Sequence, residues 1–118
     1  MRIVYIAMAG VVGTLARYGL EGWVQGRAGT LTVNLTGSLA LGFIIRYATG
    51  SIVVSPDVRA ALTIGFCGAF TTMSTFSYET MALLWDGDYW RAGFYMGATI
   101  VGCLAAVALG AALANKLL

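Results

Sequence analysis

The sequence predicts an all-α membrane protein, a single transmembrane domain of four helices over residues 1–118 in which the third helix is broken. Apolar residues make up 59% of the chain and charged residues only 10%, and the mean hydropathy is +0.83. A soluble domain of this size would have too little polar surface with that composition. Long uncharged runs supply the helices, and one of them is rich in glycine and hydroxyl groups.

Charged residues divide the chain into four uncharged runs, and a spanning helix needs about 20 mostly apolar residues. The runs cover residues 3–16, 28–45, 60–78 and 92–115. The first run is short, but Arg17 and Glu21 are one helical turn apart, so we expect this helix to continue to about Trp23. A secretory signal peptide is the alternative for this segment, although no small-residue cleavage site leads into a soluble chain.

The second predicted helix carries a thin polar face. Asn34, Ser38 and Gly42 follow one another at intervals of four residues and therefore share one side of a helix. An asparagine in hydrocarbon needs a hydrogen-bonding partner or a water-filled cavity. Hydrogen bonding between helices explains Ser38 equally well, whereas we expect Asn34 to line a pathway.

The third predicted helix contains Gly65 and Gly68, followed by a hydroxyl cluster at residues 71–75. Both residue types tolerate backbone that leaves the helical ladder, so we expect a break at mid-membrane. Carbonyl groups freed by a break are permitted only where they line a cavity or are buried in protein, and half-helix ends are recurrent ion sites. Carbonyl oxygens suit a hard cation, and hydroxyl and amide donors suit an anion.

The fourth predicted helix combines a polar stripe with small residues. Tyr95, Thr99 and Cys103 repeat the four-residue spacing, so they present hydroxyl and thiol groups on one side. For Thr99 and Cys103, bonding between helices and a pathway role explain the pattern equally well. Glycines occur in all four predicted helices, and Gly93 and Gly97 form a GxxxG pair, which predicts close helix packing in lipid.

The distribution of basic residues predicts dual topology. Arg2, Arg46, Arg59 and Lys116 fall on the side that holds both termini, and Arg17, Arg27 and Arg91 fall on the other. Because excess Lys and Arg on the cytoplasmic side normally set orientation, this near balance predicts insertion both ways and an antiparallel homodimer with closed two-fold symmetry. Alternatively, neighbours neutralise Arg27 or Arg91 and one orientation prevails.

Enzymatic chemistry is not expected. The chain has no histidine, and its two cysteines, Cys67 and Cys103, both fall within predicted helices. It contains no phosphate-cradling loop, no pair of cysteines at metal-binding spacing and no nucleophile beside a base.

Three motifs in order carry a resemblance to a known family. They are GTLARY at residues 13–18, GTLTVNLTGSLALGF at 29–43 and GFCGAFTTMSTFSYE at 65–79. Together they cover most of a four-helix chain of this length, and the chain resembles the small bacterial fluoride channels called Fluc or CrcB proteins. The resemblance implies a multi-pass protein of the bacterial inner membrane that exports fluoride passively, as an antiparallel homodimer with two pathways.

The resemblance also implies particular sites. A structural sodium ion (Na+) at the dimer centre is held by backbone carbonyls of the break, which correspond to Gly68 and Thr71. The residues expected along the fluoride pathway, including Thr99 from its spacing, are Asn34, Met73, Ser74, Thr75, Phe76, Tyr95 and Thr99.

One position departs from the family pattern. Where the family has TTFSTF this chain has TTMSTF, so Met73 replaces the first of two pathway phenylalanines. A phenyl edge carries the positive end of the ring quadrupole, and methionine offers polarised methyl hydrogens on a flexible side chain. We expect conduction to survive at an altered rate, the alternative being loss of that ion site.

Two charges lie near the predicted hydrocarbon. Arg17 resembles the first-helix arginine of the family and is expected either to concentrate anions at a vestibule or to anchor the helix at the interface by snorkelling. Glu79 ends the third motif and is expected either to order the half-helix and touch the ion route or to sit at the headgroups.

Two other functions compete with the channel. A small multidrug-type proton-coupled antiporter also has four short helices, but it needs a glutamate deep in its first helix, where residues 3–16 contain no acid. A non-transporting accessory subunit of a larger membrane complex is the third possibility, and purification of a self-contained, ion-conducting dimer would argue against it.

Overall fold

The structure is a computed structural model that describes all residues from 1 to 118, and its regular elements are all helical. Three helices are long and apolar enough to cross a membrane, namely α1 (Arg2–Trp23), α2 (Arg27–Gly50) and α6 (Tyr89–Asn115). Between α2 and α6 the chain crosses the molecule in four shorter helices, which together we call the third path. They are α3 (Pro56–Ala60), the π-helix η1 (Ala61–Cys67), α4 (Gly68–Phe70) and α5 (Met73–Trp85). The molecule extends 51 Å along its longest axis, enough to cross a bilayer with its headgroups, about 40–45 Å thick.

The first helix reaches Trp23, as predicted from the spacing of its charges. Arg17 and Glu21 lie one turn apart inside it, with 3.9 Å between guanidinium Nη1 and carboxylate Oε2. Gly26 then reverses the chain into α2 with φ of 72°, a conformation that glycine adopts without steric cost.

The third path is longer than the predicted run of residues 60–78, which was wrong at both ends. Helix α3 begins after Ser55, whose hydroxyl accepts a hydrogen bond from the Val58 amide at 3.2 Å. At the other end α5 continues to Trp85 and the chain turns at Gly87, with φ of 77°. Capping and turn residues end these helices, whereas Arg59 and Glu79 are accommodated within them.

Glycines let α1 and η1 approach closely. A Cβ added to Gly65 would lie 2.6 Å from the Ile6 carbonyl oxygen, and one added to Gly13 would overlap the Phe66 carbonyl oxygen. Only glycine fits at such backbone contacts, which supports the predicted role of small residues in packing.

The pairing of α2 with α6 depends on two further glycines. A Cβ on Gly42 would overlap the Val107 carbonyl oxygen, and a Cβ on Gly110 would overlap the Leu39 carbonyl oxygen. The predicted GxxxG pair behaves differently, because Gly93 and Gly97 have no atom within 4 Å of an added Cβ. Within one chain, this pair therefore makes no close helix contact.

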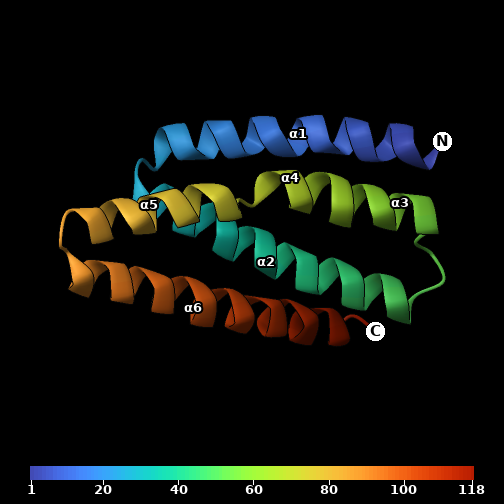
Figure 1. Ribbon diagram of the computed structural model, residues 1–118. Coiled ribbons are helices and arrows are strands. Elements are labelled where there is room, and N and C mark those ends of the chain that lie inside the picture. Colours follow the sequence, from blue (N-terminus) through green and yellow to red (C-terminus); the bar gives the residue numbers. More distant parts are fainter.

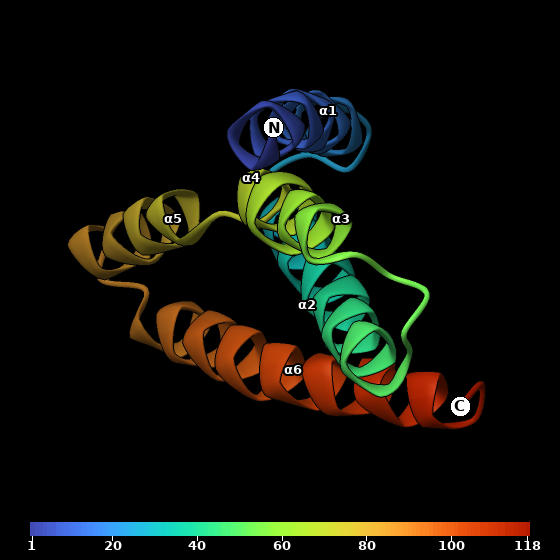
Figure 2. The same ribbon diagram turned by 90° about the vertical axis from the view of Figure 1, so that its right-hand side faces the viewer.

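The helices form an open arrangement around α2. Helices α1 and α6 lie on opposite sides of the molecule (Figure 1), and α4 packs against α1 while α6 packs against α2. Seen from the end, α5 projects to one side of α4 after the break (Figure 2), and it packs only against α2 and α6.

Both termini lie at one end of the molecule together with the α2–α3 connection (Figure 1). The α1–α2 and α5–α6 connections lie at the other end. The two ends are the two sides to which the sequence assigned the basic residues. The structure therefore keeps four basic residues at one end and three at the other.

Candidate functional site

The predicted break in the third path lies at Thr71 and Thr72, between α4 and α5. Both residues are extended, with φ/ψ of −89°/158° at Thr71 and −147°/113° at Thr72. Helix α5 then restarts under a side-chain cap, because the Thr72 hydroxyl accepts a hydrogen bond from the Thr75 amide at 3.3 Å. Two threonines therefore separate the half-helices, and they begin the hydroxyl cluster that was predicted, with Gly65 and Gly68, to break the helix.

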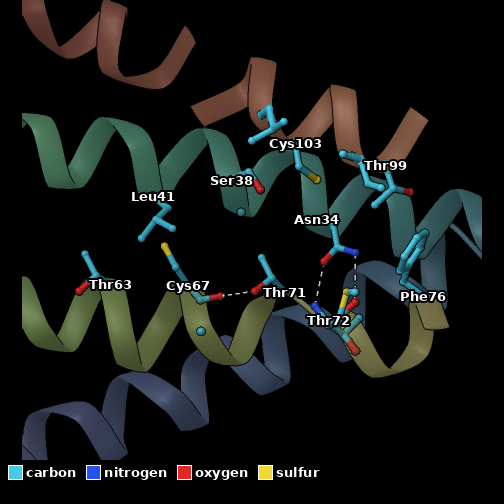
Figure 3. A pocket seen from close by; sticks show the side chains of 15 residues that line it. Asn34, Ser38, Leu41, Thr63, Cys67, Thr71, Thr72, Phe76, Thr99 and Cys103 are labelled. Carbon is cyan, nitrogen blue, oxygen red and sulfur yellow. Dashed lines mark hydrogen bonds between the residues drawn. The ribbon is translucent and has the colours of Figure 1, made fainter. Parts of the chain in front are cut away.

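Asn34 on α2 holds the break by both sides of its amide. Its Nδ2 donates to the Thr72 carbonyl oxygen at 3.1 Å, and its Oδ1 accepts from the Thr72 amide at 2.8 Å. Only 8% of Asn34 and 9% of Thr72 are exposed. The asparagine thus satisfies both main-chain polar groups of one residue that has left the helical ladder (Figure 3).

Close approach of α2 to the break requires Gly37. A Cβ at this position would overlap the Thr71 methyl group and lie 3.1 Å from the Phe70 ring. Gly37 is three residues from Asn34 and lies on the same side of α2. The glycine lets the amide of Asn34 reach Thr72.

Arg17 holds the break from the other side. Its Nε donates to the Ala69 carbonyl oxygen at 3.0 Å, from α1 to the last turn before the break. The side chain is partly buried, and the two predicted roles, a vestibule charge and an anchor that snorkels to the headgroups, stay predictions. In the structure Arg17 satisfies a helix-end carbonyl group.

Two carbonyl groups of the break have no such partner. No side chain and no amide from a turn or loop donates to the carbonyl oxygens of Gly68 or Thr71. The Thr71 hydroxyl turns back instead and donates to the Cys67 carbonyl oxygen at 2.9 Å. The carbonyl groups predicted as sodium ligands are therefore among those without such a donor, as is that of Phe70.

A groove of about 460 Å³ runs along the break, between α2 and α6 on one side and the third path on the other. Figure 3 shows Asn34, Ser38, Thr99 and Cys103 on one wall and Cys67, Thr71 and Thr72 on the other. The groove is also lined by Met73, Phe76, Gly68 and Thr71. The carbonyl groups of the last two have no side-chain, turn or loop donor. Hydroxyl, thiol and amide groups that suit an anion and carbonyl oxygens that suit a cation thus share one groove.

The Thr99 hydroxyl is a polar group without a partner. It is one of two buried side-chain atoms with no hydrogen bond, and Thr99 is only 7% exposed. Since buried polar groups are almost always bonded, the hydroxyl is available to a ligand or water in the groove. This favours a pathway role over interhelical bonding for Thr99.

Tyr95 and Glu79 form a separate pair at the α5–α6 contact. The Tyr95 hydroxyl donates to the Glu79 carboxylate at 2.8 Å. The Tyr95 ring packs against Phe76, with centroids 5.2 Å apart and planes tilted by 54°. Through Phe76, this pair adjoins the groove without lining it.

The structure brings some predicted residues together and leaves others apart. Those lining the groove are Asn34, Gly68, Thr71, Met73, Phe76 and Thr99. Those outside it are Arg17, Ser74, Thr75, Glu79 and Tyr95. Ser74 and Thr75 bond to the Thr72 hydroxyl, at 3.4 and 3.0 Å, so within one chain they order the start of α5.

Sequence reasoning placed Thr72 in the hydroxyl cluster and Gly37 among the packing glycines, but it assigned neither of them a specific role at the break. The signal that could have found Thr72 is the preference for threonine at the N-cap of a helix. Gly37 follows Asn34 in the second motif, but its need for close approach becomes visible only once α2 and the break are side by side. Cys103, predicted on the stripe with Thr99, does line the groove.

The chain is similar to known proteins over nearly its whole length. Residues 4–111 match the family model described as "CrcB-like protein, Camphor Resistance (CrcB)". The chain belongs to the CrcB family. The resemblance inferred from three motifs is therefore confirmed.

Curated relatives of this CrcB chain are similar over their full length. A protein of Geobacter metallireducens is 44% identical over 99% of both chains, and one of Geotalea uraniireducens is 44% identical over 98% of both. A protein of Geobacter sulfurreducens is also 44% identical, over 98% of both chains. Each is named "Fluoride-specific ion channel FluC". The predictions of a multi-pass membrane protein and a non-enzymatic transport family are confirmed.

Proposed function

We propose that this CrcB chain forms a passive, fluoride-selective ion channel that exports cytoplasmic fluoride from a bacterial cell across its inner membrane. The observation that carries the proposal is the 44% identity, over nearly the full chain, with relatives named as fluoride-specific ion channels. The groove supports it, because hydroxyl, amide and polarised C–H groups that suit a small anion line one side of the break.

The proposed fluoride pathway uses Asn34, Met73, Phe76 and Thr99 along the groove, with Ser74, Thr75 and Tyr95 next to it. Thr99 supplies a free hydroxyl donor, and the edge of the Phe76 ring offers positive electrostatic potential without a hydrogen bond. Weak contacts of this kind let an ion bind and leave. Glu79 would influence the route through Tyr95, whose hydroxyl it fixes.

The proposed assembly is an antiparallel dual-topology homodimer with two fluoride pathways. Met73 is 72% exposed in one chain although it lines the groove, which is typical of a residue that a partner covers. Gly93 and Gly97 contact nothing in the chain and lie within about 20° of Leu104 around α6, by a rotation of about 100° per residue. Leu104 lines the groove, so the glycine pair faces the same side.

The proposed structural sodium ion is held by the carbonyl oxygens of Gly68 and Thr71 from both copies. These two oxygens suit the ion because no side chain and no amide from a turn or loop donates to them, which leaves their lone pairs available. Oxygen ligands suit a hard cation. When bound, the ion would add positive charge between two anion pathways, while Arg17 and Asn34 hold the neighbouring carbonyl groups of Ala69 and Thr72.

Passive conduction is favoured over proton-coupled antiport. The only acid in α1 is Glu21, near the helix end, with Arg17 at 3.9 Å from it. An antiporter of the small multidrug type would need this group deep in the membrane. No observation on the groove favours a proton carrier.

The test is fluoride efflux from liposomes that contain the purified protein, read with a fluoride electrode beside chloride efflux. We expect fast fluoride release with chloride retained, and a changed fluoride rate for Met73→Phe because a phenyl edge replaces a thioether in the groove. Release no faster than from protein-free liposomes, for both forms, would contradict the channel proposal, and proton-coupled uptake of cationic drugs would be tested next.

A further inference from the structure

A second cleft, of about 210 Å³, lies between the beginnings of α2 and α6. Its lining residues are Arg27, Ala28, Leu31, Arg91, Phe94, Tyr95 and Ala98. The two arginines belong to the first turns of the helices, and Leu31, Phe94 and Ala98 follow one to two turns deeper. We propose that this cleft binds an anionic phospholipid, with the phosphate between Arg27 and Arg91 and an acyl chain along Leu31, Phe94 and Ala98.

Arg27 has no acidic partner, and Arg91 has one weak, exposed ion pair that leaves donors for a phosphate. Arg27 makes no ion pair within 4.0 Å. Arg91 has one carboxylate near it, Asp88 at 3.6 Å, and its side chain is 71% exposed. The Asp88 carboxylate also caps α6 by accepting from the Arg91 amide at 3.3 Å. Arginine binds phosphate oxygens by a planar fork of donors, so two arginines at one cleft are suited to a phosphodiester group.

The depth of the cleft matches the headgroup region. Three tryptophans at the same end of the molecule are exposed: Trp23, Trp85 and Trp90. Tryptophans gather where headgroups meet hydrocarbon, and arginines near that level attract anionic lipids. A phosphate held by Arg27 and Arg91 would therefore leave its acyl chain at hydrocarbon depth, beside Phe94 and Ala98.

The cleft and the groove open to different sides of α6. Around this helix, Phe94 and Ala98 are about 180° and 140° from Cys103 and about 80° and 120° from Leu104, and both Cys103 and Leu104 line the groove. In the proposed dimer the groove faces the partner, so the cleft faces lipid. The orientation of the cleft toward lipid rests on the proposed dimer, whereas the binding of a lipid by the cleft does not depend on fluoride conduction. Two copies in opposite orientation would place one such site in each leaflet.

The experiment is native mass spectrometry of the purified protein with phosphatidylglycerol or phosphatidylcholine of the same acyl chains. The substitutions are made in a Lys116→Gln background, so that Arg91→Gln leaves three basic residues against two and insertion stays balanced. We expect preferential retention of phosphatidylglycerol in the background protein, and a loss of preference of about fivefold on Arg91→Gln.

A second pair of variants tests the apolar part of the cleft. Ala98→Phe fills it and should lower retention of phosphatidylglycerol. Ala105→Phe is the matched control, because Ala105 is exposed, lies on nearly the same side of α6 two turns deeper and lines neither cleft nor groove. It should retain the lipid like the background protein.

Equal retention of the two lipids, or a preference that both Arg91→Gln and Ala98→Phe leave intact, would overturn the proposal. It would also be overturned if Arg91→Gln slowed fluoride efflux in pure phosphatidylcholine liposomes without changing lipid retention, since the arginines would then collect the permeating anion. Lipid selectivity in a protein that conducts no fluoride would support the cleft and contradict the channel.

Discussion

At the scale of single residues, Asn34 should matter for stability as much as for conduction. Replacing Asn34 by alanine leaves the Thr72 amide and carbonyl groups without partners, and each unsatisfied buried group costs about 1–3 kcal/mol. We expect earlier unfolding in dodecyl sulfate titrations of mixed micelles, together with slower fluoride efflux. Ser38→Ala, one turn away on the same face and without a hydrogen bond, is the control. Equal stability of both variants would mean that Asn34 does not hold the break.

Thr99 should matter for conduction but not for stability. Thr99→Val keeps the shape of the side chain and removes a buried hydroxyl that has no partner in the chain, so stability should not fall. If that hydroxyl donates to fluoride, efflux should slow by about tenfold or more, because hydrogen bonds to charged groups are worth about 1.5–3 kcal/mol. Thr99→Ser, which retains the donor, should stay close to the parent rate. Unchanged efflux from Thr99→Val would remove Thr99 from the pathway.

These two residues also show how far sequence reasoning reaches. Spacing on a single helix predicted that Asn34 and Thr99 lie on polar faces, and both line the groove. The partner of Asn34 is 38 residues away and that of Arg17 is 52 residues away. Periodicity describes one helix at a time, so it could not show that Arg17 donates to the Ala69 carbonyl oxygen.

At the scale of helices, the sequence predicted the existence of each element better than its ends. The break was expected because glycine and hydroxyl residues tolerate irregular backbone, and it lies at Thr71 and Thr72. Charges were a poor guide to the third path, because Arg59 and Glu79 are tolerated within helices that caps and turns delimit. The packing glycines were identified as a class, but only their contacts in the folded chain separate Gly110, which touches the backbone of α2, from Gly93, which does not.

This separation gives a prediction for the α2–α6 pair. Gly110→Ala places a methyl group against the Leu39 carbonyl oxygen and the Phe43 amide. The helices must move apart, at a cost of about 1–3 kcal/mol, typical of overpacking. Dodecyl sulfate titration should register it as a loss of stability. Gly93→Ala adds the same methyl group where one chain has open space, and should be tolerated in protein kept monomeric by dilution. Similar losses for both would show that helix propensity or lipid, not this contact, sets the effect.

At the scale of the whole molecule, charge and shape favour the same assembly. The groove with its free carbonyl groups and the open Gly93 and Gly97 face one side, where a partner would complete them. Four basic residues at one end against three at the other leave orientation nearly undecided. A copy inserted each way is what the proposed antiparallel dimer needs.

Removing basic residues from one side should therefore fix the orientation of the chain and test whether function needs both orientations. Arg27→Gln with Arg91→Gln leaves four basic residues against one, which should fix a single orientation and abolish fluoride efflux from cells, because no opposite copy is present. Arg46→Gln, Arg59→Gln and Lys116→Gln together leave one against three and should fix the reverse orientation, with the same loss. Co-expression of the two chains should restore efflux, since each supplies the other's missing partner. Efflux from either variant alone at the parent rate would mean that copies in one orientation suffice, and the antiparallel dimer would be abandoned even if fluoride conduction stood.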